Sequence, residues 1–324
     1  MKSKKKLVST VLGIAISVAA LVIIFKKIDV AVSVERIMNS RWELIPAMMS
    51  VYLFSFIARG VRWQLMLKHF GDIPFKSSFN GVALGYAGNN VLPGRGGEFV
   101  RMEYLTRSSQ IPRVTVLSSI FAERVIDGLV LLLILYLSML AARSSITKEE
   151  WLLNLLVTSG VIFGAAFASI VFIRIFGGKI ARYLSERTGW VFQVASKLLE
   201  NIASALYFFN NNTGFYVIIL LSILVWLIEG AVFVLGLIAV NMGVNLPMAY
   251  LCLSVVNFGL LIPSSPGYIG VFQGMTILCL SLFGVMRETS FSASVLIHMS
   301  QFIPITLVGL IIFMIAVNKM RMKE

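Results

Sequence analysis

Residues 215–240 read FYVIILLSILVWLIEGAVFVLGLIAV, an apolar run that contains a single ionisable side chain, Glu229. A helix of about 20 apolar residues spans the hydrocarbon core of a bilayer, so this run is long enough to cross a membrane. Five further apolar stretches of spanning length occur at 7–25, 44–67, 114–141, 151–176 and 291–317. The pattern predicts a polytopic, all-α membrane protein with about six full transmembrane helices, in which residues 1–324 form a single membrane domain.

The composition supports this interpretation. The chain is 58% hydrophobic and 13% charged, whereas soluble domains carry about 25% charged residues. In such a protein the net charge of +13 reflects the orientation of the spans in the membrane and attraction to anionic lipid headgroups. The sequence has no nucleic-acid-binding motif, no phosphate-binding loop of an ATPase and no metal-ligand spacing among its few His and Cys residues, so we expect no nucleic acid partner and no metal or cofactor.

Two further apolar regions, 75–106 and 247–283, are interrupted by Pro and Gly near their middles. Each could be two spans or one re-entrant hairpin, because irregular backbone at membrane depth must be buried in protein or line a wet cavity. The distribution of Lys and Arg places both termini in the cytoplasm and mildly favours re-entrant hairpins. We therefore expect a multi-pass protein of the cytoplasmic membrane.

The two halves of the chain share one order of elements: span, span, broken region, span. Residues 1–145 and 146–324 are therefore predicted to be two pseudo-repeats, and three crossings in each would make the second inverted relative to the first. Corresponding interrupted segments in such repeats point to a transporter's binding site. Between the later spans, residues 179–210 show apolar side chains at helical spacing and predict one amphipathic helix in the cytoplasmic interface.

The first break, 88–101, reads GNNVLPGRGGEFVR. A helix restarting near Gly97 would offer free N–H groups and the positive end of its dipole to an anion, and the Arg95 fork suits phosphate. The candidate binding residues here are Asn90, Arg95, Gly96, Gly97, Glu98 and Arg101. The alternative is a cytoplasmic turn whose arginines touch lipid phosphates nonspecifically.

The second break, within 257–274, has no charged residue and offers hydroxyls and amides instead. The candidate binding residues are Ser264, Ser265, Gly267 and Gln273. Gly270 and Gly274 are four residues apart and could serve helix packing alone.

Ionisable side chains inside spans are costly and usually face a partner or a wet cavity. The polar residues expected to form an intramembrane network are Arg59, Glu123, Arg124, Asp127, Glu229, His298 and Gln301. Arg59 and Glu229 are a candidate pair between the halves. The network could bind a headgroup or couple protons, or it could be a structural ion-pair lock. Arg62, nearer the end of its span, is expected to extend to the interface.

Three motifs in order carry a family resemblance: Asn90-x-x-Pro93-Gly94-Arg95-Gly96-Gly97-Glu98 with Arg101, then Glu123-Arg124-x-x-Asp127, then Pro263-x-x-Pro266-Gly267-x-x-Gly270. Together they resemble the flippase-like membrane region of lysylphosphatidylglycerol synthases, across essentially the whole chain. The resemblance implies movement of a modified lipid between leaflets. Bifunctional members carry a cytosolic aminoacyl-transferase domain that this sequence does not show, so synthase activity is not implied.

Three functions remain open at this point. The first is a lipid flippase or transporter for a phosphate-bearing polar lipid, such as an aminoacylated phospholipid, a glycolipid or a polyisoprenoid-linked lipid. The second is a membrane-embedded transferase in which Glu123 and Asp127 supply a base or ligands. The third is a non-catalytic partner of a glycosyltransferase. Expected partners are membrane lipids with anionic headgroups, with a second copy of the chain or a lipid-modifying enzyme as further possibilities.

Overall fold

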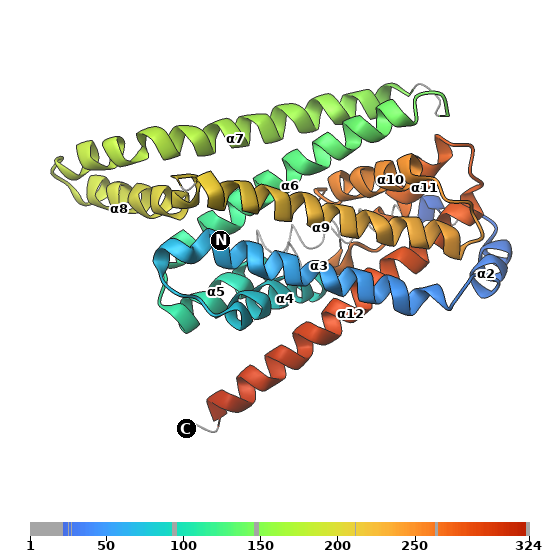
Figure 1. Ribbon diagram of the computed structural model, residues 1–324, viewed down its shortest axis with the longest axis horizontal. Helices are drawn as coiled ribbons and strands as arrows, with labels where there is room; N and C mark the ends of the chain where they lie inside the picture. The colour runs from blue at the N-terminus through green and yellow to red at the C-terminus, as the bar shows by residue number, and fades with distance from the viewer. Residues whose placement is uncertain are drawn as a thin grey trace.

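The computed structural model describes residues 22–24, 26, 28–92, 96–145, 149–210, 212–262 and 265–321. In this part of the chain every regular element is helical (Figure 1). The α-helices are α2 (Val30–Met38), α3 (Leu44–Leu67), α4 (Phe75–Val91), α5 (Gly97–Ser109), α6 (Arg113–Ala141), α7 (Glu150–Ser185), α8 (Trp190–Ala205), α9 (Asn212–Ala239), α10 (Leu246–Gly259), α11 (Val271–Ser281) and α12 (Arg287–Arg321). Short 3-10 turns, η1 (Lys68–Phe70), η3 (Tyr207–Asn210) and η4 (Pro266–Tyr268), join some of them.

Five of the described helices, α3, α6, α7, α9 and α12, are long and apolar enough to cross a membrane. They coincide with five of the predicted spans, and α3 has the predicted bounds. The polytopic all-α fold is thus confirmed. The predicted first span, 7–25, lies outside the described residues except near its end.

The two interrupted regions form helical hairpins. Helices α4 and α5 pack against each other, as do α10 and α11. At 1.5 Å per residue these helices are about 26, 20, 21 and 16 Å long, which is shorter than the roughly 30 Å hydrocarbon core. The lengths agree with re-entrant hairpins. Their depth in the membrane and the inverted relation of the halves stay predictions.

Helices α3 and α9, one from each predicted half, pack side by side in opposite directions (Figure 1). At one end of the pair, the Arg41 side chain donates to Asn241 Oδ1 at 3.0 Å. At the other end, the rings of His69 and Tyr207 stack with centroids 3.9 Å apart. These contacts define two ends of the bundle, and the membrane side that each end faces stays a prediction.

The segment 179–210 is not one helix, so that prediction is wrong in its bounds. Helix α7 continues to Ser185, the chain turns at Gly189 with φ +127°, and α8 folds back on α7. Ser196 Oγ donates to the carbonyl of Ala181 at 2.7 Å and ties the two together. The apolar residues at the end of α7 and in α8 keep the spacing of one continuous helix, so periodicity alone did not reveal the turn.

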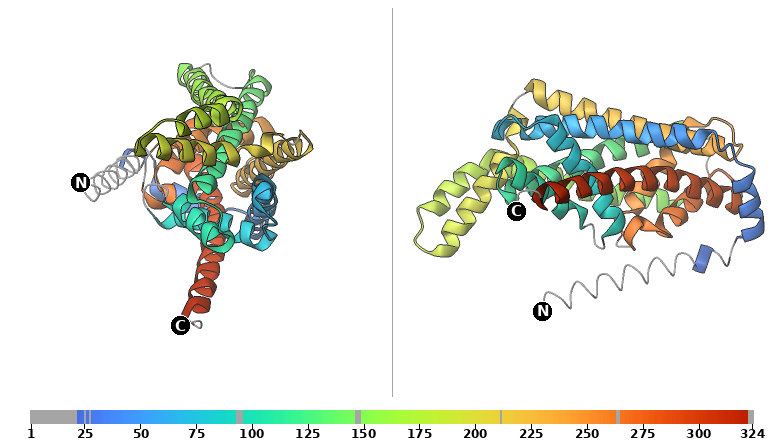
Figure 2. Two further views of the ribbon diagram at one scale, coloured as in Figure 1. Left: turned by 90° about the vertical axis from the view of Figure 1, so that its left-hand side faces the viewer. Right: turned by 90° about the horizontal axis from the view of Figure 1, so that it is seen from below.

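The α7–α8 hairpin projects beyond the rest of the bundle (Figure 1), and α12 extends from the side opposite α7 (Figure 2). Pro304 lies inside α12 and removes one backbone donor there. The part of α12 before this proline faces the centre of the bundle, where the polar residues described below are gathered.

Candidate functional site

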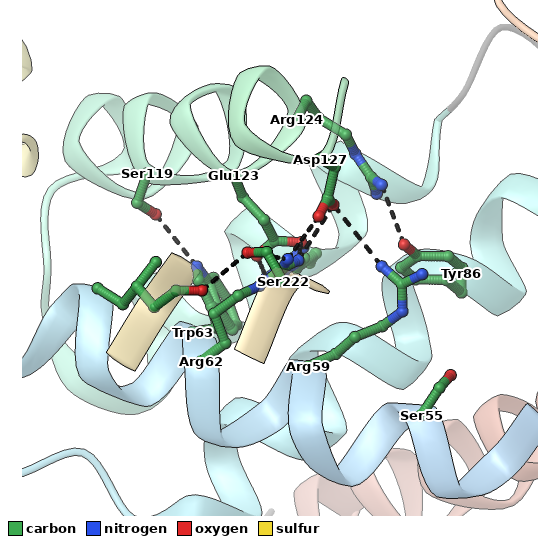
Figure 3. Close-up of polar contacts among 12 residues, drawn as sticks. Ser55, Arg59, Arg62, Trp63, Tyr86, Ser119, Glu123, Arg124, Asp127 and Ser222 are labelled. Carbon is green, nitrogen blue, oxygen red and sulfur yellow. Dashed lines mark hydrogen bonds and ion pairs between the residues drawn. The ribbon is translucent and has the colours of Figure 1, made fainter. Parts of the chain in front are cut away.

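Helices α3 and α6 each carry two ionisable residues one turn apart, Arg59 and Arg62 on α3, and Glu123 and Asp127 on α6. Residues three or four apart share one face of a helix, so each pair points in one direction. The two faces meet, and all four side chains are buried. Figure 3 shows the arginines reaching from α3 toward Asp127.

Arg62 forms a two-pronged ion pair with Asp127, with Nη1–Oδ1 at 2.5 Å and Nη2–Oδ2 at 3.1 Å. Its Nη2 atom also lies 3.1 Å from Glu123 Oε1, and Nη1 donates to Ser222 Oγ on α9. Both Nη atoms of the guanidinium are therefore paired inside the bundle. The expectation that Arg62 extends to the interface was wrong, because acids on a different helix hold it inside.

Arg59 joins the two halves of the chain. Its Nη2 atom lies 2.5 Å from Glu229 Oε1 on α9, and its Nη1 atom lies 3.7 Å from Asp127 Oδ2. The guanidinium carbon is 4.9 Å from the centre of the Tyr86 ring and 5.2 Å from that of Trp226. Aromatic faces attract a cation, so these rings add to the carboxylates in stabilising the buried charge.

Arg101 lies in the same network and not on an open surface. Its two Nη atoms contact the two Oε atoms of Glu123 at 3.1 and 2.7 Å, and its guanidinium carbon lies 3.8 Å from the centre of the Trp63 ring. The side chain is fully buried. Arg101 was predicted to bind substrate, but in the structure Glu123 already takes both prongs of its fork.

The pair Arg124–Glu98 is the most accessible ion pair of the network. Arg124 Nη2 and Nε approach Glu98 Oε1 at 2.8 and 3.1 Å, and Arg124 Nη1 contacts the Tyr86 hydroxyl at 3.0 Å. The two side chains are 30% and 19% exposed, whereas the other members are nearly inaccessible. This pair therefore lies where the buried network meets open space.

Four arginines and four acids make up this network in the described part of the chain. They are Arg59, Arg62, Arg101 and Arg124, with Glu98, Glu123, Asp127 and Glu229. Because burying an ion is costly unless it is paired and hydrogen-bonded, the equal charge count explains how so many ions can lie inside an apolar bundle. Within the same residues, no three His, Cys, Asp or Glu side chains come together as a metal-ligand set.

A cavity of about 210 Å³ lies against the network. Its wall includes Arg59, Asp127, Glu229 and the Arg124–Glu98 pair, and both helical hairpins contribute residues to it. Liquid water occupies about 30 Å³ per molecule, so the space is large enough for a small polar group such as a lipid headgroup. The sequence predicted most of these charged residues, and the structure places them around one hollow.

Some polar atoms at this cavity have no hydrogen-bond partner among the described residues. They are Nε and Nη1 of Arg59 and Oε2 of Glu98, all buried. Buried polar atoms in folded proteins are almost always satisfied, so an unsatisfied one at a cavity wall points to a ligand or solvent partner. Arg59 therefore has spare donors beside the cavity.

The first break also differs from its prediction at the start of α5. The helix does restart at Gly97, but the Gly97 N–H donates to Asn89 Oδ1 at 3.0 Å, so it is not available to a phosphate. Glu98 and Asn90 line the cavity, and the Asn90 amide donates to Thr306 Oγ1 on α12 at 2.8 Å. Gly96 is partly exposed. Arg95, with the rest of 93–95, lies outside the described residues.

The second break is held against the first across α12. Gly267 has φ +70°, and a Cβ there would lie 2.8 Å from the Phe302 ring and 3.4 Å from the carbonyl of Asn90. A side chain would disturb this meeting of the two breaks, which makes glycine the residue that fits. Of the hydroxyls predicted to bind, Ser265 does not line the cavity and Ser264 lies outside the described residues.

Gln273 is also placed differently from its prediction. Its Oε1 accepts from the Gly270 N–H at 2.8 Å, and its Nε2 lies 3.1 Å from His298 Nδ1. The amide is buried, its two ends are bonded and it does not line the cavity, so it caps α11. His298 stacks on Phe272 with centroids 4.5 Å apart, and His298 and Gln301 both face the cavity.

Sequence reasoning missed Arg62 and the aromatic side chains around Arg59. Trp226 lies one turn before Glu229 on α9, and its Nε1 donates to Asp127 Oδ1 at 3.1 Å. An aromatic residue one turn from a lone intramembrane acid was the available signal. Tyr86 had no comparable signal, because its partners Arg59 and Arg124 are on other helices.

Comparisons with known proteins agree with this architecture. Residues 10–309 match the family described as "Lysylphosphatidylglycerol synthase TM region". The chain is 21% identical to a UPF0104 membrane protein of Methanocaldococcus jannaschii, over 99% of each chain. It is 24% identical to a UPF0104 membrane protein of Methanothermobacter thermautotrophicus, over 77% of this chain and 78% of that one.

A third relative is longer. The glycosyltransferase AglD of Haloferax volcanii is 22% identical, with 96% of this chain aligned to 55% of that protein. The chain therefore spans about half of this relative. Because the family match covers nearly the whole sequence and the structure is an all-helical bundle with five membrane-length helices, the chain is a multi-pass membrane protein that belongs to the lysylphosphatidylglycerol synthase TM region family.

Proposed function

We propose that this protein binds a phosphate-bearing polar lipid by its headgroup in the central cavity and moves it between the leaflets of the cytoplasmic membrane. The observation that carries the proposal is Arg59, a buried cation at the cavity wall with two donor nitrogens lacking a hydrogen-bond partner among the described residues. Its Nη1–Asp127 separation of 3.7 Å is too long for a hydrogen bond. A phosphate oxygen would supply the missing acceptor, and charge-assisted bonds of this kind are strong.

The mouth of the cavity favours a lipid over a water-soluble ligand. Leu261 lines the cavity and is 45% exposed. Val91 and Leu92 at the first break and Ile262 at the second are also exposed apolar side chains. Charged residues inside the cavity, with exposed apolar side chains at both breaks, match a molecule with a polar head and apolar tails.

The pairing of α4–α5 with α10–α11 supports transport over simple binding. The two breaks meet near Gly267 and Asn90, and the cavity is bordered by both hairpins. Interrupted segments meeting at a central site are typical of transporters in which one part moves against the other. The lipids considered remain aminoacylated phospholipids, glycolipids and polyisoprenoid-linked lipids.

The transferase alternative fits the geometry less well. It needed Glu123 and Asp127 as a base or as ligands, but Glu123 is covered by Arg62 and Arg101 and does not line the cavity. Asp127 accepts from Arg62 and Trp226. Both carboxylates are therefore already engaged by residues of the protein itself. Consumption of a polyisoprenyl-phosphate donor by purified protein would restore this alternative.

The partner alternative rests on the projecting α7–α8 hairpin. Trp190 at its turn is 78% exposed, and basic residues such as Arg182 and Lys197 lie on the same hairpin. This surface is available to a glycosyltransferase, another lipid-modifying enzyme or a second copy of the chain. Co-purification that is lost when Trp190 is replaced by Ala, with lipid exchange unchanged, would favour a scaffold role in addition to transport.

Reconstitution into liposomes tests the proposal. Vesicles of phosphatidylcholine would contain traces of phosphatidylglycerol or another anionic lipid labelled on one acyl chain, and an impermeant reductant would report the label in the outer leaflet. We expect the protein to accelerate exchange of at least one phosphate-bearing lipid over protein-free vesicles. Unchanged exchange across a broad panel of phospholipids, glycolipids and polyisoprenyl phosphates would overturn the proposal.

A further inference from the structure

The lining of the cavity changes from charged to apolar along α6. Arg124 and Asp127 line one end, and Gly128 and Leu131 follow on the same face of the helix. The distance along the axis from Arg124 to Leu131 is about 10 Å, from seven residues at 1.5 Å each. One face of one helix thus passes from charge to apolar surface within the length of a lipid headgroup and the first carbons of its tail.

The apolar end of the cavity is walled by two aromatic rings from different helices. Phe163 on α7 and Phe258 on α10 both line the cavity, with ring centroids 5.8 Å apart and planes inclined by 53°. Beyond them the wall continues through Leu260 to Leu261, which is also exposed on the outer surface. The apolar end therefore lies between the charged centre and the outside of the bundle.

Phe163 sits directly on the backbone of α6. A Cβ built on Gly128 would lie 2.0 Å from the Phe163 ring, so only glycine leaves room for the ring in this position. The ring covers α6 at the point where the lining changes from Asp127 to Leu131. Phe163 is therefore placed across the boundary between the two ends of the cavity.

Helix α7 is the least embedded of the membrane-length helices described. In its most apolar stretch 11% of the residues are buried, compared with 44% in α6 and in α9. It packs mainly along α6 and α8. Because few buried contacts hold this part of α7, an outward movement of Phe163 would disrupt little packing.

We infer that the apolar end of the cavity, lined by Leu131, Phe163, Phe258 and Leu261, is a subsite for the proximal part of a lipid tail, and that Phe163 controls passage of the tail into the surrounding membrane. This inference rests on the proposed lipid transport. It adds the orientation of the substrate, with the phosphate toward Arg59 and the tail leaving between α6, α7 and α10. A headgroup without a tail would fill the charged end alone.

The test uses the liposome exchange assay with labelled phosphatidylglycerol, or with whichever phosphate-bearing lipid of the panel the wild type moves. Phe163→Trp enlarges the ring on the α6 backbone, and we expect exchange to slow about tenfold. Phe163→Ala removes the ring from the passage between α6, α7 and α10, so this variant should exchange lipid at least as fast as the wild type. Val161→Trp is the control, because Val161 is on the same helix and 67% exposed.

The outcomes separate the inference from the function it rests on. If Phe163→Trp exchanges as fast as Val161→Trp while Arg59→Gln is slow, the tail subsite is wrong and transport through the cavity stands. If Arg59→Gln is as fast as the wild type as well, the proposed function fails. Thermal unfolding of each purified variant shows whether it is folded, and if Phe163→Trp is not, Phe163→Ala decides: exchange slower than the wild type would overturn the subsite.

Discussion

Arg59 Nη2 lies 2.5 Å from Glu229 Oε1, and this contact joins helices 170 residues apart in the chain. Both side chains are buried, and Ser55 Oγ also contacts Glu229 Oε1 at 3.3 Å. The pair holds the predicted halves together beside the cavity. It also orients the guanidinium, with its remaining donors beside the cavity.

Breaking the Arg59–Glu229 pair from one side should destabilise the protein. Removing one partner of a buried ion pair leaves the other charge uncompensated, which costs about 3–5 kcal/mol. We expect Arg59→Gln and Glu229→Gln each to lower the thermal unfolding temperature in detergent, and the double variant to recover part of the loss. A double variant whose destabilisation equals the sum of the single ones would show that the residues do not interact.

Arg62 should not tolerate lysine. Its guanidinium contacts Asp127 with both prongs and reaches Glu123, and the single ammonium of lysine cannot reproduce this arrangement. We expect Arg62→Lys to cost about 2 kcal/mol or more, since it leaves buried acceptors unpaired. The matched control is Arg107→Lys, whose pair with Glu103 is exposed and is expected to change the unfolding temperature little. Equal unfolding temperatures for the two variants would contradict the buried role of Arg62.

The first hairpin depends on close approach of α4 and α5 at Gly97. A Cβ on Gly97 would lie 1.9 Å from the Gly85 carbonyl oxygen and 2.5 Å from the Asn89 nitrogen, both backbone atoms that cannot move aside cheaply. We expect Gly97→Ala to destabilise the protein by about 3 kcal/mol or more, at the upper end of overpacking costs. Gly160→Ala on α7 is the control, because no atom lies within 4 Å of its new methyl group. A Gly97→Ala protein as stable as Gly160→Ala would show that the hairpin is packed differently.

The topology can be mapped with single cysteines, after the buried Cys252 and Cys279 are replaced. The contacts Arg41–Asn241 and His69–Tyr207 mark opposite ends of α3. We therefore expect cysteines at positions 68 and 245 to react with an impermeant thiol reagent from opposite sides, with 68 cytoplasmic. The inverted repeats further predict that cysteines at 95 and 265 react from opposite sides. Reaction of both from the same side only would refute the inverted repeats.

Local sequence was enough to predict most of the fold. The bounds of α3 and the positions of α6, α9 and α12 follow from apolar length alone. The Pro and Gly breaks marked both hairpins. The turn at Gly189 was not recognised, because the apolar residues before and after it keep the spacing of one unbroken helix.

The sequence predicted those site residues whose role can be inferred from the helix that carries them. Glu229 stood out as the lone acid of its span, and its pairing with Arg59 was anticipated. Arg62, Arg101 and Gln273 were misplaced because their partners come from other segments. Each of these side chains pairs with a polar side chain far away in the sequence. The residue pattern within a single helix cannot reveal such a partner.

The most direct test of the central claim compares lipid exchange by wild type, the double variant Arg59→Gln with Glu229→Gln, and Arg107→Gln in the same liposomes. The double variant removes both members of the buried charge pair, so it should remain folded, which its thermal unfolding would check. If Arg59 holds the lipid phosphate, exchange by the folded double variant falls about tenfold or more, since a charge-assisted bond contributes about 1.5–3 kcal/mol. Arg107→Gln stays at the wild-type rate. Exchange by the folded double variant at the wild-type rate would contradict transport through this cavity.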